Sequence, residues 1–533
     1  MSTRRWQEEF ESLAAFSRDL ETRPALPEAS PEELAAHAEQ VARTQDVLSL
    51  VAVLPASARP PVMEWDDLLG PLWRRLFAKG DDVTRYILAD LWRGVLLEAG
   101  CKERFYRSST AVAASARDFY RFEEALTVCQ DARKAADGEE SAALANLLNT
   151  EGTVHVCRGN YAAAEAAYNE ALGMAERLGE DAFTRLPGPS RQDFLAQELI
   201  NLFDCYLHRG HAETGAERVR VVKRARKFYE QLLRMPFSED YRQLHETNLG
   251  ELLILEGKIP EARTLLTAEL EAGSHQGPYA LSLSAMRGRL LSCAAELEGE
   301  WGEAYRWIRW ALKTGTTHTY PAEEQFVLEQ AIAVLRGLHE VHDIASTGLL
   351  VEDLSLLLED KDWYTGSSHS RNVGRRALLL GKLLKESCGW DLDLDILSKA
   401  GLLHDIGKLR LPWSLLNKIA PITPKEWDLL RDHSAYGAGI LEEMGMGEVG
   451  QVVLQHHETL DGSGYPNHRP PDRMASIVAV CDAFEAATTP NRRYKVPKRP
   501  AEMLGEFKRE AGRLYHPDVV EALATLVHSQ EAL

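Results

Sequence analysis

Residues 401–408 read GLLHDIGK, residues 431–437 read RDHSAYG, and residues 455–466 read QHHETLDGSGYP. The potential metal ligands in these segments are His404, Asp405, His433, His456 and His457. Imidazole nitrogens bind first-row transition metals, and a carboxylate can ligate the same ions. Two ions held close together clamp a phosphoryl group and lower the pKa of a bound water. The pattern therefore predicts a dinuclear metal centre.

A lone His-Asp pair is weak evidence, because short motifs match by chance. The chain contains a second pair, His342-Asp343, which is followed by Ile-Ala-Ser and has no Gly-Lys or later histidines in register. We interpret that pair as structural. The stretch from His404 differs, because several uncommon features occur there in one order and at compact spacing.

HDIGK at 404–408, HHETLDGSGYP at 456–466 and HSRNV at 369–373 resemble the HD-GYP family of bacterial cyclic dinucleotide phosphodiesterases. The resemblance runs from about Ser346 to Ser529. A generic HD-domain phosphohydrolase would share the His-Asp pair but not the DGSGYP element. The resemblance implies a helical bundle and hydrolysis of cyclic di-GMP by a metal-activated hydroxide.

The resemblance also implies two divalent transition-metal ions, with iron or manganese the leading candidates. The implied ligands are His369, His404, Asp405, His433, His456, His457 and Asp482. Asp405 would bridge the two ions and act in catalysis. Thr365 stands where some family members carry a glutamate that recruits a third metal, so two ions are expected. Asp482 lies in the apolar segment 476–487, where a buried carboxylate is costly unless it is paired or metal-bound.

Substrate contacts are implied for five residues: Lys408, Gly464, Tyr465, Arg492 and Lys495. Lys408 would also stabilise charge that develops in the reaction, and is thus the second catalytic residue. Gly464 and Tyr465 belong to the DGSGYP loop, which by resemblance borders the substrate pocket. Arg492 and Lys495 match the family's R-x-Y-K element, and arginine can bind phosphate through two parallel hydrogen bonds.

A loose repeat covers residues 119–312. Three of its units place a small residue five positions after a glycine and an apolar residue four positions later: Gly159-Ala164-Tyr168, Gly257-Ala262-Leu266 and Gly299-Ala304-Ile308. The pattern resembles tetratricopeptide repeats, whose helix pairs stack into a superhelix. The unit spacing exceeds the usual length of about 34 residues, and a generic α-solenoid is the alternative. Such arrays bind a peptide or partner helix, but this one could equally serve self-association or pack on the catalytic domain.

These observations predict an all-α protein, an α-solenoid of helix pairs followed by an HD-GYP helical bundle. The expected parts are an N-terminal helical segment at 1–110, tetratricopeptide-like repeats at 111–320, a connecting helix at 321–345 and the metal-dependent domain at 346–533. The repeats are expected to bind a protein partner or to mediate self-association.

The composition narrows the function classes. The formal net charge of −20 argues against general binding to DNA or to an anionic membrane. The seven cysteines are scattered and form no CxxC pair, as in a reducing compartment. No apolar run approaches the roughly 18 residues of a membrane helix, and the N-terminal residues lack the apolar core of a signal peptide. We expect a cytoplasmic protein.

Two other interpretations remain open from the sequence. The chain could be a signalling adaptor that binds a cyclic dinucleotide and turns it over weakly or not at all. It could also hydrolyse another cyclic nucleotide, such as a mixed cyclic dinucleotide.

Overall fold

The computed structural model describes residues 82–184, 190–235, 239–271, 280–315, 321–341, 347–362, 368–416, 422–489 and 497–528. Residues 1–81 of the predicted N-terminal segment, and Arg492 and Lys495, lie outside these ranges. The chain divides into two compact units, residues 1–327 and 328–533. Within the described ranges the secondary structure is helical, and one isolated bridge between Ala511 and Tyr515 is the sole extended pairing. The prediction of an all-α protein is confirmed.

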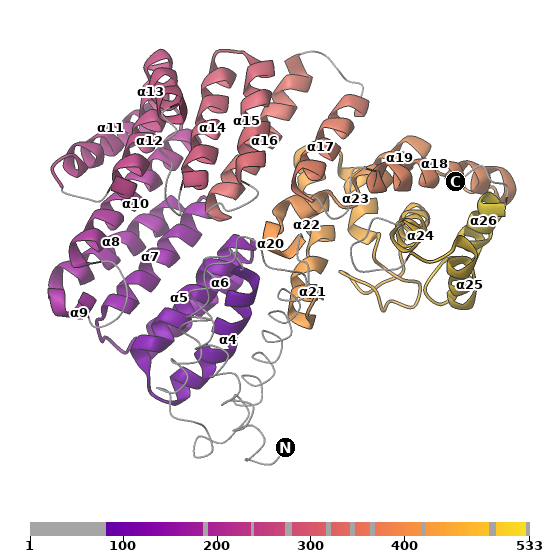
Figure 1. The fold of residues 1–533 in the computed structure, drawn as a ribbon, viewed down its shortest axis with the longest axis horizontal. Coiled ribbons are helices and arrows are strands. Elements are labelled where there is room, and N and C mark those ends of the chain that lie inside the picture. The colour runs from indigo at the N-terminus through magenta and orange to yellow at the C-terminus, as the bar shows by residue number, and fades with distance from the viewer. Residues whose placement is uncertain are drawn as a thin grey trace. The chain divides into compact units, whose positions relative to one another are not determined.

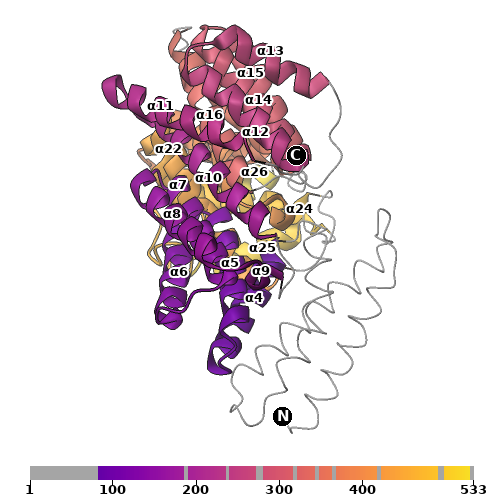
Figure 2. The same cartoon turned by 90° about the vertical axis from the view of Figure 1, so that its left-hand side faces the viewer.

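The first unit is a series of helices that follow one another in space as they do in sequence (Figure 1). They are α4 (Asp82–Glu98), α5 (Lys102–Asp118), α6 (Phe122–Ala136), α7 (Ala142–Cys157), α8 (Tyr161–Arg177), α9 (Glu180–Thr184), α10 (Arg191–Ala212), α11 (Gly215–Leu232), α12 (Glu239–Leu255), α13 (Ile259–Glu271), α14 (Ala280–Leu297) and α15 (Trp301–Gly315). The pairs α5–α6, α7–α8, α10–α11, α12–α13 and α14–α15 pack as hairpins, and each pair also contacts its neighbour (Figure 2).

The repeated glycines close three of these hairpins in the same way. Gly159, Gly257 and Gly299 have φ of +70°, +76° and +77°, values that residues with a Cβ rarely adopt. The residue after each glycine donates its backbone N–H to the carbonyl five positions earlier, at 2.9 Å in all three turns. This Schellman geometry ends the first helix and turns the chain back. In the α5–α6 hairpin Tyr120 holds the left-handed position instead, which explains why the repeat pattern is weaker there.

Close helix contact within a hairpin depends on small residues. A Cβ at Gly152 of α7 would lie 2.5 Å from the ring of Tyr168 on α8. Gly250 of α12 stands in the same relation to Leu266 on α13, at 2.6 Å. Tyr168 and Leu266 occupy the apolar positions of the sequence repeat. The repeat therefore reflects the packing of the two helices of each hairpin.

Helix α16 (Pro321–Val341) contains the division between the two units. The second unit continues with α17 (Thr347–Lys361), α18 (His369–Cys388), α19 (Leu394–Leu403), the 3₁₀ helix η2 (Ile406–Arg410), α20 (Trp413–Leu416), α21 (Pro424–Arg431), α22 (His433–Glu443), α23 (Gly447–Gln455), α24 (Arg473–Thr488), α25 (Pro500–Glu510) and α26 (Pro517–His528). Helix α18 packs on α19, α24 and α26, while α22 packs on η2 and α23.

Side-chain caps set where several helices of the second unit begin. Asp393 accepts the N–H groups of Asp395 and Ile396 at the start of α19, and Asp472 accepts that of Ala475 at the start of α24. A reciprocal capping box joins Thr423 and Glu426 at the start of α21. The caps of α19 and α24 thus fix the starts of the helices that lead to His404 and carry Asp482.

Among the described helices, none has the length and apolar character required to cross a lipid bilayer.

Candidate metal centre

The predicted ligands lie at helix ends or on a buried helix face. His369 and His433 are the first residues of α18 and α22, and His404 and His456 directly follow α19 and α23. Asp405 precedes η2. Asp482 lies within α24, and His457 follows His456. The structure thus brings together all seven residues predicted as metal ligands.

The first of two clusters contains His369, His404 and Asp405, whose ligand atoms all lie within 4.8 Å of one another. Asp482 joins this cluster, with its Oδ1 3.2 Å from His369 Nε2 and 3.6 Å from His404 Nε2. His369, His404 and Asp405 are all buried, at 5% exposure or less. Two imidazoles and two carboxylates therefore converge, and of these four side chains only that of Asp482 is partly exposed.

The second cluster contains His433, His456 and His457, again with ligand atoms within 4.8 Å of one another. His433 Nε2 lies 3.3 Å from His456 Nε2, although α22 and α23 present them from different helices. Each neutral imidazole has one acceptor nitrogen, which needs a hydrogen-bond donor or a cation as its partner. Three such rings in close contact are therefore favourable for a shared cation.

Asp405 connects the clusters, one oxygen to each. Its Oδ2 lies 3.3 Å from His404 Nε2, whereas its Oδ1 lies 3.5 Å from His433 Nε2. A carboxylate placed in this way can ligate one cation through each oxygen. The two oxygens therefore face the two clusters separately.

Backbone carbonyls orient three of the imidazoles. His404 Nδ1 lies 2.9 Å from the Gly401 carbonyl, and His433 and His456 make the same contact at 2.6 Å with Leu430 and Val453. When Nδ1 carries the proton and its N–H donates to a carbonyl, Nε2 keeps a free electron pair for a metal ion. This is the usual arrangement of a metal-binding histidine.

Two buried nitrogens show how well these residues fit metal ions. His369 Nε2 and His404 Nε2 are fully buried, and neither has a hydrogen bond of acceptable geometry within the described part of the chain. A buried polar atom without a partner costs free energy. Both atoms point at the carboxylates of the first cluster, so a cation there would satisfy them.

The electrostatics favour the same occupancy. Burial lowers the pKa of His433 and of His456, and it lowers the pKa of His457 to about 3. Burial alone would lower the pKa of His404 too, but the Asp405 carboxylate raises it to about 10. The pKa of Asp405 lies well below its usual range, because Lys408 and His404 outweigh the effect of burial. Neutral imidazoles and ionised carboxylates are the ligand forms that metals require. His433, His456, His457 and Asp405 already have these forms, whereas a cation in the first cluster would take the place of the proton that the raised pKa keeps on His404.

Lys408 reaches the bridging carboxylate directly. Its Nζ lies 2.8 Å from Asp405 Oδ2 and 3.2 Å from Asp362 Oδ2. Asp362 is 3% exposed. The sequence motifs assigned no role to Asp362, because its pairing with Lys408 depends on the packing of α17 against η2. An aspartate directly after an apolar helical segment was the available signal.

Gly407 lets η2 approach α22. A Cβ at this position would lie 1.8 Å from the His433 carbonyl oxygen and 2.4 Å from the Gly437 nitrogen. Both contacts are with backbone, which cannot move aside as a side chain can. Glycine is therefore required where Asp405 and His433 meet.

The DGSGYP loop rests against the second cluster. The Tyr465 ring stacks on His457 with centroids 4.8 Å apart, and the Arg431 guanidinium lies 5.5 Å from the centroid of the same ring. A Cβ at Gly464 would lie 2.4 Å from the His457 carbonyl. Gly464 and Tyr465, predicted as substrate contacts, thus lie directly beside a metal-ligand candidate.

Glu458 holds this loop in place. The side chain is 2% exposed and accepts the backbone N–H groups of Asn467, at 2.5 Å, and Arg469, at 3.2 Å. These hydrogen bonds fix the backbone that follows the DGSGYP loop.

Comparison with known proteins agrees with this geometry. Residues 355–519 match a family model described as an HD domain. The second unit contains an HD domain. The match spans α18, α19, η2 and α22 to α24, and therefore every residue of the two clusters.

Characterised relatives share this HD domain region. A cyclic di-GMP phosphodiesterase of Thermotoga maritima is 35% identical over 183 residues, which cover 33% of this chain and 48% of that protein. A 3'3'-cGAMP-specific phosphodiesterase of Vibrio cholerae is 32% identical over 33% of this chain and 34% of its own length. A cyclic di-GMP phosphodiesterase of Pseudomonas aeruginosa is 37% identical over 24% of this chain and 32% of that protein. The chain spans less than half the length of these curated relatives.

Proposed function

We propose that this chain is a metal-dependent phosphodiesterase that hydrolyses cyclic di-GMP. The observation that carries the proposal is Asp405, whose two oxygens face separate clusters of buried histidines. The named activities of the relatives that share the HD domain support the same substrate class.

The first cluster and the second cluster would each hold one divalent ion, with Asp405 shared. Two such ions would polarise a phosphoryl oxygen and lower the pKa of a coordinated water. Iron or manganese fits the donor set, which offers nitrogen and oxygen but no sulfur.

The chain's own residues would do the remaining work. Lys408 holds positive charge beside Asp405, where it would offset negative charge that builds up on a phosphoryl group. Gly464 and Tyr465 would border the substrate on the side of the second cluster. Arg492 and Lys495 are proposed phosphate contacts on the strength of the sequence motif.

A second candidate substrate is a mixed cyclic dinucleotide, because one of the relatives is specific for 3'3'-cGAMP. The proposal also keeps a role for the first unit. Its stacked helix pairs form an extended array, a construction that commonly binds protein partners, and we assign it partner binding or self-association.

The test is hydrolysis by the full-length chain, purified without oxygen and loaded with iron or manganese. Chromatography should show loss of cyclic di-GMP and appearance of a linear dinucleotide or mononucleotides, and parallel reactions with 3'3'-cGAMP would rank the two substrates. A rate equal to that of the metal-free protein would reject the enzyme in favour of a cyclic-dinucleotide-binding adaptor.

A further inference from the structure

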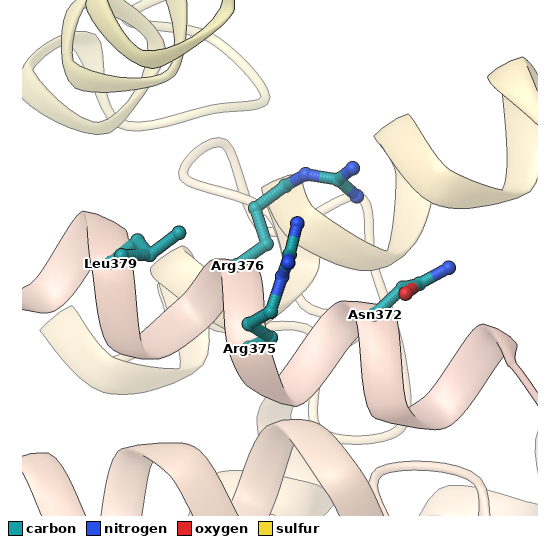
Figure 3. A pocket seen from close by; sticks show the side chains of 4 residues that line it. All are labelled: Asn372, Arg375, Arg376 and Leu379. Atoms are coloured by element: carbon teal, nitrogen blue, oxygen red, sulfur yellow. The ribbon is translucent and has the colours of Figure 1, made fainter. Parts of the chain in front are cut away.

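A pocket opens along one side of α18, close to the metal ligands. Four residues line it, Asn372, Arg375, Arg376 and Leu379, and it is a shallow hollow that is open to solvent (Figure 3). The side chains of Arg375 and Arg376 extend from adjacent positions of the helix toward the same space (Figure 3).

Arg376 is held rigidly. It is 9% exposed, its Nη1 lies 2.7 Å from Glu485 Oε2, and its guanidinium lies 4.8 Å from the centroid of the Phe484 ring on α24. Its Nε is buried and has no hydrogen-bond acceptor among the described residues. One donor side of a buried guanidinium therefore remains unsatisfied.

The pocket carries excess positive charge. None of the four lining residues is acidic, and Glu485, which pairs with Arg376, already accepts hydrogen bonds from Asn372, Arg376 and Thr489. Arg375 is exposed, and no ion pair joins it to an acidic side chain of the described residues. Two guanidinium groups against one occupied carboxylate favour an anion, and a planar guanidinium matches a phosphate in shape and charge.

The position of the pocket relates it to the metal centre. His369, Asn372 and Arg376 are spaced three and four residues apart, so they share one face of α18. On α24, Glu485 follows Asp482 by about one turn. The two helices meet at His369 and Asp482, 3.2 Å apart, and again at Asn372 and Glu485, 2.7 Å apart. The pocket therefore begins about one helical turn, roughly 5 Å, from the first cluster.

We propose that this pocket is a subsite for a second phosphate of the substrate, with Arg375 and Arg376 as its binding residues. This proposal rests on the proposed function. A cyclic dinucleotide carries two phosphodiesters in one ring, so a ligand whose scissile phosphate lies at the metal centre must place another anion close by. Arg376, fixed by Glu485, would orient that phosphate, and the exposed Arg375 would close over it.

The test uses the metal-loaded full-length chain and the variant Arg375→Glu, which changes an exposed side chain and leaves the Arg376–Glu485 pair intact. The matched control is Lys382→Glu, an equal charge change at an exposed position further along α18. We expect Arg375→Glu to weaken calorimetric binding of cyclic di-GMP about tenfold or more, Arg375→Lys to retain most of the binding, and Lys382→Glu to change it less than about twofold.

A substrate with a single phosphodiester separates this subsite from the metal centre. Hydrolysis of bis(p-nitrophenyl) phosphate should show the same KM in the wild type and in Arg375→Glu, because that ester has no second phosphate. Equal losses of cyclic di-GMP binding in Arg375→Glu and Lys382→Glu, or an equal rise of KM for both esters, would overturn the subsite. Binding that depends on Arg375 without any turnover by the wild type would support the subsite and reject the proposed enzyme.

Discussion

His369 Nε2 lies 3.2 Å from Asp482 Oδ1, although α18 and α24 are far apart in the sequence. The packing of α18 against α24 makes this contact, and the Arg376–Glu485 pair reinforces it about one turn away. The first cluster is consequently a tertiary feature, because His404 and Asp405 from the HDIGK motif supply only half of it.

The two clusters predict about two metal ions per chain. We expect elemental analysis of protein purified without oxygen to find iron or manganese at this stoichiometry. Chelation should abolish hydrolysis and lower the unfolding temperature, since a ligand that binds only the folded state stabilises it. Readdition of the metal should restore both. Folded protein with one ion or none at saturating metal would contradict the assignment.

Asp405→Asn should disrupt the bridge with little change in side-chain size. We expect loss of at least one ion and a fall in hydrolysis of at least about a hundredfold, because even indirect metal partners contribute about 10–100-fold. Asp395→Asn on α19 is the control, since Asp395 is exposed and pairs with Lys399. Wild-type metal content and activity in Asp405→Asn would show that the carboxylate does not bridge.

Gly407→Ala should destabilise the HD domain strongly. The added methyl group would lie 1.8 Å from the His433 carbonyl, so η2 and α22 must separate, and overpacking typically costs about 1–3 kcal/mol. Gly439→Ala, on α22, adds the same methyl group at an ordinary distance of 3.5 Å from Arg410 and should unfold at or slightly above the wild-type temperature. Thermal unfolding measures the midpoint temperature of each variant. Similar midpoints for Gly407→Ala and Gly439→Ala would refute the close approach of η2 to α22.

Lys408→Ala should lower kcat about tenfold to a hundredfold, the effect of losing one charge-assisted interaction. Metal content should persist, because Lys408 is not a ligand. Lys399→Ala, which removes a lysine from α19, should leave kcat unchanged. Steady-state kinetics on metal-replete samples would measure this effect. An unaltered kcat in Lys408→Ala would show that Lys408 takes no part in catalysis.

His245 predicts a pH dependence of stability in the first unit. The ring is 3% exposed and stacks on Tyr229 with centroids 4.6 Å apart, and burial lowers its pKa from 6.5 to about 4. A lowered histidine pKa means that the unfolded chain binds the proton more tightly. Its contribution to folding is therefore full above about pH 6.5 and is lost as the pH falls toward 4.

Chemical unfolding at several pH values measures this effect. His245→Phe keeps an aromatic ring in the stack but cannot be protonated, so the free energy of unfolding of that variant should fall less than the wild type's between pH 6.5 and pH 4. Identical slopes for the two proteins would show that His245 does not titrate in this range.

Local sequence patterns determined the chemistry and the helical class of this protein. The Gly-x₄-small-x₃-apolar repeat predicts the hairpins because turn closure and helix contact are governed by residues only a few positions apart. The HDIGK motif and the His456-His457 pair likewise predict metal ligands, because donor atom types depend on residue identity and not on the fold. All seven predicted ligands converge in the structure, as the motif order suggested.

Tertiary structure decided how those ligands are shared. Whether His433 joins His404 or His456, whether Asp405 faces one cluster or two, and which acid holds Lys408 all depend on the packing of α17, η2, α22 and α24. Motif spacing cannot reveal these relationships, because they join segments that are distant in sequence and are set by the burial of apolar faces elsewhere in the bundle. The pocket beside Arg375 and Arg376 on α18 also depends on tertiary packing, because the approach of α24 gives Arg376 its fixed orientation.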